Sequence, residues 1–211
     1  TPHEFFFDEC LKLDIHLPSY NKYDMGVLFF PKEIRLREDC SAIINRCAET
    51  LRLEIMGYRR VPVNTADIGS SALSVEPEIE QVFIACPDHI TNPDEFERKL
   101  FVLRNYATQT INNTVKKDSI GFYVASLSYK TIIYKGQLTS LQVRGYFPDL
   151  SNKKVVSAFG LIHSRFATNT FPSWKLTQPF RYIAHNGEIN TLQKNLNWLR
   201  TSEKSFVSQF F

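Results

Sequence analysis

Two apolar stretches in the last third of the chain end on polar residues that could do chemistry together. The first runs over Gly160-Leu-Ile-His-Ser-Arg165 and leads into Phe166-Ala-Thr-Asn-Thr170. The second runs over Phe180-Arg-Tyr-Ile-Ala-His185, breaks at Asn186-Gly187 and passes into a predicted helix that starts near Asn190. Short apolar runs bounded by polar residues indicate buried strands. We therefore expect two strand ends that present groups able to bind a small zwitterion or an oxyanion.

The dipeptide Asn186-Gly187 has two interpretations. Asn-Gly is the strongest short signal for a hairpin turn. Alternatively, the Asn186 side-chain amide and the Gly187 backbone N–H could both face an amide carbonyl that develops negative charge under attack, since glycine lets the backbone approach closely. The two interpretations are compatible, because a turn can present both donors.

Arg165 and two histidines are further candidates for a site. Arg165 could be a solvated strand end or part of a structural ion pair, but its planar guanidinium could also bind an α-carboxylate through two parallel hydrogen bonds. His163 and His185 are possible bases or ligands, yet neither occurs at the HxxH or HExxH spacing of metal sites. Half-buried imidazoles bonded to backbone groups are the favoured interpretation for both histidines.

Other familiar site chemistries find little support. Ser164 lies beside a histidine, but the chain lacks the G-x-S-x-G motif of a serine hydrolase. The cysteines show neither CxxC spacing nor histidine pairing, so they predict no metal site, no disulfide framework and a reducing compartment. Cys40 and Cys47 share one face of a predicted helix, which is typical of small buried packing residues. The four cysteines are Cys10, Cys40, Cys47 and Cys86.

Composition excludes several classes of function. The 211 residues are 43% hydrophobic and 22% charged, which is typical of a globular protein with a sizeable core. A net charge of +3, with basic residues scattered among acidic ones, argues against a nucleic-acid partner. No apolar run approaches the ~18 residues of a membrane span, and the opening Thr1-Pro-His-Glu4 shows no signal-peptide pattern.

Capping residues and helical spacing of apolar residues predict several helices before residue 150. Thr1-Pro-His-Glu4 and Asn92-Pro-Asp-Glu95 each combine a capping residue, a proline and a glutamate three residues after the cap. The apolar spacing over residues 32–56 predicts a helix that stops at Gly57. A short helix is predicted over residues 139–146, starting on a capping residue.

Strands and helices together predict an α+β fold. Apolar runs predict strands over residues 25–30, 58–63, 81–85, 122–126 and 131–134, the last two as a hairpin. These strands and helices follow no strict βαβ rhythm, so we expect a largely antiparallel sheet in a single domain. Near the C-terminus, Leu192, Leu196 and Leu199 predict a helix with a buried stripe. That helix would fix where Asn186 and Gly187 point.

The motifs named first resemble those of a known family. His163-Ser-Arg-Phe-Ala-Thr168 and His185-Asn-Gly-Glu-Ile-Asn190 are similar to the glutamine-binding half of a class II glutamine amidotransferase domain. The longer match, from Thr170-Phe-Pro-Ser-Trp174 through Gln178-Pro-Phe-Arg-Tyr-Ile-Ala-His-Asn-Gly-Glu-Ile-Asn-Thr191, resembles the glutamate synthase branch of that family. Earlier stretches match as well, so the resemblance covers nearly the whole chain. They are Pro2–Phe6, Lys22–Gly26, Arg60–Asn64, Glu80–Phe83, Phe96–Leu100, Ser126–Ser128 and Tyr134–Gly136.

The resemblance implies a fold and a set of roles. The fold would be a four-layer αββα sandwich of the N-terminal nucleophile hydrolase type, with mostly antiparallel sheets and incomplete at both ends. Asn186 and Gly187 would form the oxyanion hole. Trp174 would be a core aromatic or part of a loop that closes over substrate. The implied substrate-binding residues are Arg165, which takes the α-carboxylate, with Thr168, Phe166, Asn169 and His185.

Two of those positions distinguish branches of the family. Phe166 and Asn169 stand where some other class II members have Trp and His. This difference argues against the branch that aminates sugar phosphates and fits the glutamate synthase branch.

The family's nucleophile has no counterpart among these residues. In the family an N-terminal cysteine attacks glutamine, and its free α-amino group serves as the base. Residue 1 here is Thr1, followed by Pro2. We therefore expect residues 1–211 to be a partial type 2 glutamine amidotransferase domain, an internal piece without the nucleophile and inactive alone.

The resemblance also implies partners for the complete enzyme. L-glutamine would be the substrate, and a downstream synthase domain with FMN and an iron–sulfur cluster would convert 2-oxoglutarate to glutamate. No cofactor is expected in these residues. Ferredoxin, NADH or NADPH could be the electron donor, and cytoplasm or plastid the compartment. The alternatives are another class II amidotransferase, such as an asparagine synthetase or a purine-pathway enzyme, and a non-catalytic interaction domain that kept the fold.

Overall fold

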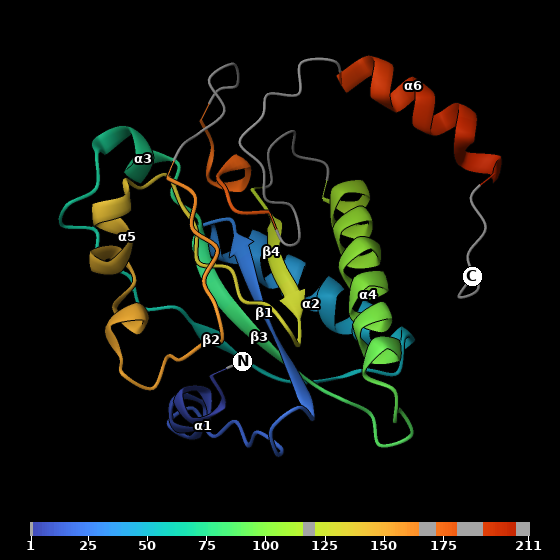
Figure 1. Ribbon diagram of the computed structural model, residues 1–211, viewed down its shortest axis with the longest axis horizontal. Coiled ribbons are helices and arrows are strands. Elements are labelled where there is room, and N and C mark those ends of the chain that lie inside the picture. The colour runs from blue at the N-terminus through green and yellow to red at the C-terminus, as the bar shows by residue number, and fades with distance from the viewer. Residues whose placement is uncertain (1, 116–120, 165–171, 181–191, 206–211) are drawn as a thin grey trace.

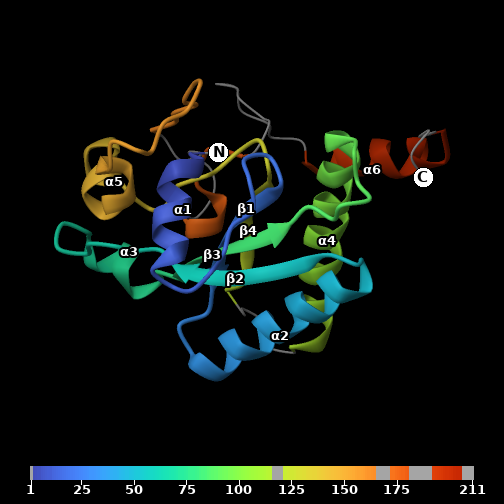
Figure 2. The same cartoon turned by 90° about the horizontal axis from the view of Figure 1, so that it is seen from below.

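A four-stranded antiparallel sheet with helices on both faces forms the centre of the molecule (Figures 1 and 2). The computed structural model describes residues 2–115, 121–164, 172–180 and 192–205. The strand order is β2-β3-β1-β4. The strands are β1 (Tyr23–Phe30), β2 (Glu54–Arg60), β3 (Glu78–Ala85) and β4 (Tyr123–Ser128).

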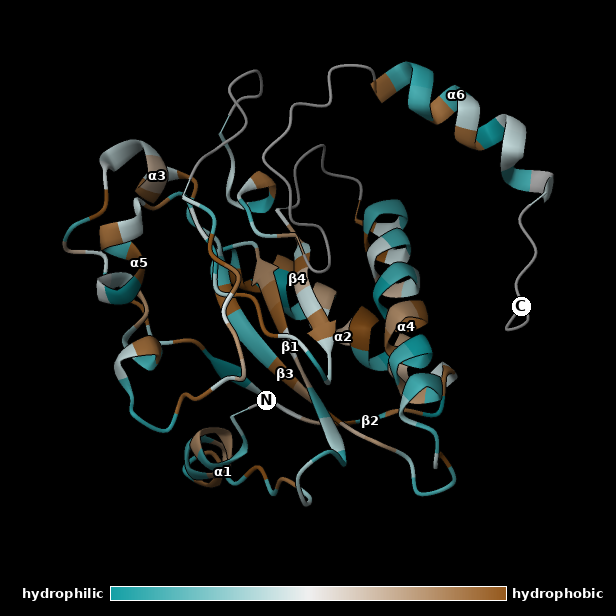
Figure 3. Cartoon of the chain, viewed as in Figure 1, coloured by the Kyte–Doolittle hydropathy of each residue, from teal (hydrophilic) through white to brown (hydrophobic). Residues whose placement is uncertain are grey.

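Strand β1 is the central strand, and every one of its residues is buried. It pairs with β3 from Tyr23 opposite Ala85 to Phe30 opposite Glu78, and with β4 on its other edge. Because side chains alternate between the faces of a strand, β1 contributes to two separate hydrophobic clusters. Leu28 and Phe30 belong to the first, and Met25, Val27 and Phe29 to the second. Figure 3 shows the apolar character of the central strands.

The first cluster lies between the sheet and the two long helices, α2 (Ile34–Thr50) and α4 (Pro93–Thr114). Helix α4 begins as predicted, with the Asn92 side chain accepting a hydrogen bond from the backbone N–H of Asp94 at 2.9 Å and Pro93 in the first turn. Its predicted buried face is confirmed. That face is Leu100, Leu103, Ala107 and Ile111.

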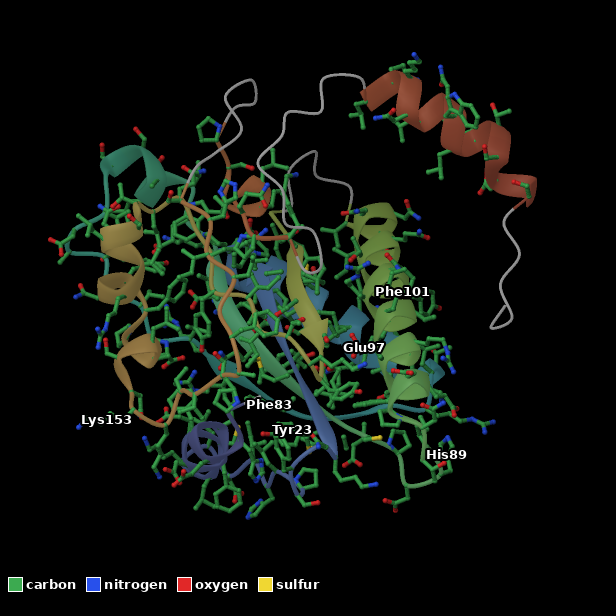
Figure 4. The ribbon with its side chains drawn as sticks, viewed as in Figure 1. Tyr23, Phe83, His89, Glu97, Phe101 and Lys153 are labelled. Atoms are coloured by element: carbon green, nitrogen blue, oxygen red, sulfur yellow. The ribbon has the colours of Figure 1, made fainter. Side chains whose placement is uncertain are left out.

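The second cluster covers the opposite face of the sheet with shorter elements (Figure 2). Figure 4 shows Tyr23 of β1 beside Phe83 of β3 in this cluster, with their ring centroids 6.4 Å apart. The capping residue predicted at the start of this helix is confirmed as Thr139, and the Gln142 side chain completes a capping box with it. The elements on this side are α1 (His3–Leu11), α3 (Ser70–Ser74), α5 (Ser140–Tyr146), and the 3₁₀ turns η1 (Pro148–Ser151) and η2 (Trp174–Leu176).

A buried ionic network connects the elements of the second face. The Arg59 guanidinium donates to both carboxylate oxygens of Asp149 at 2.8 Å, and also to Gln81 at 2.8 Å and Glu9 at 3.0 Å. The Tyr134 hydroxyl donates to Asp149 at 3.0 Å. Together these residues tie α1, β2, β3, η1 and the segment after β4. We call them the Arg59 network.

The antiparallel α+β prediction is confirmed, with corrections to several of its elements. Helix α2 ends at Thr50 and not at Gly57, which lies within β2. Arg52 supplies the left-handed backbone at φ 56°, and the N–H of Leu53 donates to the carbonyl of Ala48 at 2.9 Å, which closes the helix. The sequence offers no glycine there to signal the stop. As a result β2 begins at residue 54, earlier than the predicted residue 58.

The second correction concerns residues 131–134, which form no strand. The hydroxyl of Ser128 accepts from the Lys130 N–H at 3.1 Å, and that of Ser126 accepts from the Ile133 N–H at 3.3 Å. Within this segment the Ile133 N–H is therefore bound by a serine side chain of β4, where the predicted hairpin would have used a backbone carbonyl. Similarly, residues 160–164 of the first predicted strand end form no strand.

The third correction concerns α6 (Leu192–Ser202), the predicted helix near the C-terminus. It has no buried residues, and Leu192 and Leu199 are 68% and 54% exposed. Its predicted stripe is therefore not buried against the described part of the chain. In Figure 1 the helix stands apart from the sheet.

At the N-terminus, α1 starts at His3 with Pro2 as its N-cap residue, so proline does not occupy the first helical position. The predicted capping residue Thr1 lies outside the described residues.

The Arg59 network predicts the effect of Asp149→Ala on stability. The substitution would leave a buried guanidinium without its two-pronged partner, and breaking such a pair costs about 3–5 kcal/mol of unfolding free energy. Urea unfolding followed by circular dichroism would measure the loss. Asp8→Ala is the matched control, because Asp8 pairs with Lys154 where both side chains are over two-fifths exposed, and water weakens such pairs. Equal losses in the two variants would contradict a stabilising role for the network.

Candidate functional site

The predicted site residues lie outside the described residues of the structure. None is placed relative to the sheet, and their roles stay predictions. They are Arg165, Phe166, Thr168, Asn169, His185, Asn186 and Gly187. The structure does describe residues 160–164, directly before Arg165, and residues 172–180, which end five positions before His185.

The segment before Arg165 exposes large apolar side chains. Phe159 and Ile162 are 81% and 86% exposed, while His163 is half-buried as predicted. Ser164 is exposed.

The sequence leaves Trp174 as either a core aromatic or part of a loop over substrate, and the structure distinguishes the two. Its side chain is 4% exposed, and its indole N–H donates to the carbonyl of Ala72 at 3.0 Å. The ring lies edge-on to Phe29 at 6.3 Å and tilted against Tyr146 at 5.6 Å between centroids. In this structure Trp174 is therefore a core aromatic of the second cluster.

Lys135 holds the residues after Trp174 in place. The lysine is 3% exposed, and its ammonium donates to the backbone carbonyls of Lys175 and Thr177, each at 3.0 Å. It also lies 4.7 Å from the ring centroids of Tyr123 and Phe180. In the sequence, Tyr134-Lys-Gly136 stands out only as a match to the family, because a single lysine gives no local signal of burial.

The four cysteines are poor candidates for a nucleophile. Burial raises the pKa of Cys10 to about 12 and that of Cys40 to about 11, and it also raises the pKa of Cys47 and Cys86. A reactive cysteine needs the opposite shift, because the thiolate is the attacking species. Cys40 and Cys47 are buried on one face of α2, as predicted.

Asp24 is a fully buried carboxyl group on the α4 side of β1. Burial raises its pKa well above the ordinary value, and the charge of Glu97 on α4 (Figure 4) adds to the rise. The backbone N–H groups of Met25 and Ser128 favour the charged form and offset this only in part. Among the described residues, no group makes a well-formed hydrogen bond to either carboxylate oxygen. Apolar burial without such partners favours a neutral Asp24 at neutral pH.

Two further observations concern possible ligands and location. Within the described ranges, no three or more histidine, cysteine, aspartate or glutamate side chains gather in a way that could hold a metal ion. None of the described helices has both the length and the apolar character that crossing a membrane requires.

Comparison with known proteins gives a family match over the whole chain. The family described as glutamine amidotransferases class-II matches residues 1–211. The chain is 43% identical over 210 residues to the glutamate synthase [NADPH] large chain of Bacillus subtilis, and 42% identical over 219 residues to glutamate synthase [NADH] of Saccharomyces cerevisiae. Both alignments cover 100% of this chain but only 13% and 10% of the respective relatives.

A plant relative extends the range of electron donors in the names of similar proteins. The chain is 38% identical over 184 residues to ferredoxin-dependent glutamate synthase 2, chloroplastic, of Arabidopsis thaliana. This alignment covers 87% of the chain and 11% of the relative. The chain thus spans roughly a tenth of the length of the relatives it matches.

The buried carboxyl group of Asp24 predicts a pH-dependent stability. Below the unfolded-state pKa of ~3.9, both states keep the proton and the group adds no pH-linked penalty. Above it, the unfolded chain releases the proton while the folded protein retains it, so stability falls as the pH rises toward the raised folded pKa. Asp24→Asn should therefore stabilise the protein at pH 7, by a margin that shrinks toward pH 4. Denaturant unfolding across this pH range would measure the margin.

Asp88→Asn is the matched control for Asp24, because Asp88 is exposed in a loop. We expect it to alter stability little at either pH. A stability margin of Asp24→Asn that does not change between pH 4 and 7 would rule out a raised pKa at this position.

Proposed function

The chain belongs to the class II glutamine amidotransferases, and on that premise we propose that residues 1–211 form part of the glutaminase domain of a glutamate synthase. The main support is a match of 43% identity over the whole chain to a glutamate synthase large chain. The match includes the long motif from Thr170 to Thr191. The Phe166 and Asn169 positions favour this branch over other class II amidotransferases.

The proposed site binds L-glutamine at its amino-acid end through Arg165. The guanidinium would pair with the α-carboxylate through two hydrogen bonds, a geometry that lysine cannot reproduce. Thr168 would assist. Phe166, Asn169 and His185 would complete the pocket.

The same site acts on the side-chain amide of glutamine. As the amide carbonyl is attacked, its oxygen gains negative charge, which the Asn186 side-chain amide and the Gly187 backbone N–H would stabilise. Preorganised donors of this kind act mainly on the transition state, so they raise turnover more than affinity.

The proposed reaction is a hydrolysis in two steps. The α-amino group of an N-terminal cysteine takes the proton of that cysteine's own thiol, and the thiolate attacks the amide carbon. The C–N bond then breaks, and ammonia leaves with the proton returned by the α-ammonium group of the cysteine. Water then cleaves the thioester, which yields glutamate and regenerates the thiol. We assign the nucleophile to a cysteine outside residues 1–211, since burial raises the pKa of all four cysteines within them.

The fold supports the assignment at a coarser level. Each face of the described sheet is covered, one by α2 and α4 and the other by the second cluster. We propose that residues 1–211 form one partial domain of a four-layer αββα sandwich, to which sheet strands outside the described residues contribute.

The ammonia would serve glutamate biosynthesis in the complete enzyme. A synthase domain elsewhere in the protein would use it to convert 2-oxoglutarate to glutamate, with FMN and an iron–sulfur cluster supplying electrons. We assign no residue of this chain to either cofactor. The electron donors in the names of the relatives are NADPH, NADH and ferredoxin, and the proposal is compatible with each.

The oxyanion role predicts the effect of Asn186→Ala in the full-length protein. Removing one oxyanion donor typically lowers kcat by ~10²–10³-fold. The KM for glutamine should change little, because the donor acts mainly in the transition state. A coupled assay of glutamate release, without 2-oxoglutarate, would measure both constants. Unchanged turnover would remove Asn186 from the oxyanion hole.

Arg165→Lys is the contrasting control at the other end of the substrate. It keeps the charge but loses the paired hydrogen bonds, so we expect a higher KM with kcat largely retained. A normal KM in this variant would exclude Arg165 as the carboxylate ligand. If the wild-type full-length protein releases no glutamate from glutamine, the domain is a non-catalytic member of the family.

A further inference from the structure

Lys135 occupies an unusual position for a lysine, because its ammonium group is buried between two aromatic rings. The residue is 3% exposed, and its Nζ atom lies 4.7 Å from the ring centroids of both Tyr123 and Phe180. Burying a charged group is costly unless hydrogen bonds and favourable charges replace water. We therefore expect the cost of burying this cation to be offset by the groups that it binds.

The ammonium group holds two backbone carbonyls of one short turn. It donates to the oxygens of Lys175 and Thr177 at 3.0 Å, and the Tyr123 hydroxyl lies 3.4 Å away. Hydrogen bonds from a charged donor are shorter and stronger than neutral ones. Two such bonds, made at positions 175 and 177, fix both the place and the direction of the chain between them.

The neighbouring glycine provides the second half of this arrangement. A Cβ atom at Gly136 would lie 2.4 Å from a ring carbon of Trp174, so only glycine lets the indole rest against the backbone there. The Thr177 hydroxyl closes the turn by donating to the carbonyl of Trp174 at 2.8 Å. We call residues 174–180 the anchored segment.

The anchored segment precedes the proposed oxyanion residues in the sequence. Asn186 follows Phe180 by six positions, and six residues span at most ~20 Å when fully extended. Catalytic donors must be held close to the productive geometry by the elements that flank them. Among the described residues, the part of the chain that comes before Asn186 in the sequence is the one that Lys135 binds.

We propose that Lys135 is a positioning residue for the oxyanion hole, which it serves by fixing the anchored segment. The catalytic part of this inference rests on the proposed function. The part that concerns the anchored segment rests on the contacts of Lys135. An apolar residue would fill the space between Tyr123 and Phe180 at lower cost. Only a side chain with several N–H donors, such as lysine, can bind two carbonyls of the turn at once.

The test compares Lys135→Met with Lys175→Met in the full-length protein. Methionine keeps the length of the lysine side chain without its donors. Lys175 is the matched control, because its side chain is exposed while its backbone carbonyl, which Lys135 binds, is kept. Two measurements are made on each protein: kcat and KM for glutamine hydrolysis, and hydrogen–deuterium exchange of residues 173–180.

For Lys135→Met we expect faster amide exchange in the anchored segment and a fall in kcat of about tenfold or more, since small displacements of catalytic groups are costly. KM should stay within about twofold, because Arg165 is not affected. For Lys175→Met neither measurement should change. A purely structural role would lower the active fraction and the melting temperature, but kcat per correctly folded molecule would be kept.

The other possible results distinguish a failure of the positioning role from a failure of the proposed function. Faster exchange with unchanged kcat, or unchanged exchange, would overturn the positioning role while the proposed function stands. If the wild-type protein hydrolyses no glutamine, the proposed function fails and the catalytic part of this inference fails with it, while exchange still shows whether Lys135 holds the segment. If Lys135→Met does not fold, Thr177→Val removes the hydroxyl that closes the turn and should shift kcat and exchange in the same direction.

Discussion

The constraint on which the structure depends is the burial of β1 on both of its faces. An eight-residue strand with no exposed position needs cover on each side, and the alternation of its side chains divides the molecule into two cores. The long helices α2 and α4 cover one face through regular apolar stripes. Among the described elements, short helices and turns cover the other face, and buried polar contacts help the second cluster to fix their positions.

The second face is therefore held by polar groups with several donors. The Arg59 network joins α1, two strands and η1, and Lys135 joins the segment after β4 to the turn at Trp174. Both cations are almost fully buried. Because protein groups replace water around them, each cation binds a defined set of partners. Trp174, in the described segment that precedes the proposed oxyanion residues in the sequence, packs in the core on this face. The polar contacts of Lys135 thus join that segment to the packing of the sheet.

The sequence predicts elements well where local signals decide them. The Asn92 cap, the buried stripe of α4 and the capping residue Thr139 are local features, and the structure contains all three. It fails where the deciding contact is distant or gives no local signal. Arg52 closes α2 without a glycine, and serine hydroxyls of β4 accept backbone N–H groups of the chain that was expected to pair with it as a strand. Lys135 and Asp24 are buried only because of tertiary packing, so no local sequence pattern predicts their burial. The proposed site itself rests on motif resemblance and lies outside the described residues.

In the proposed function, this chain binds glutamine beside a cysteine located elsewhere in the protein. The decisive experiment treats the full-length protein with a diazo-ketone analogue of glutamine and locates the adduct by peptide mass spectrometry. We predict one adduct, on an N-terminal cysteine outside residues 1–211, and protection by glutamine. An adduct on Cys10, Cys40, Cys47 or Cys86, or no adduct and no protection, would contradict it.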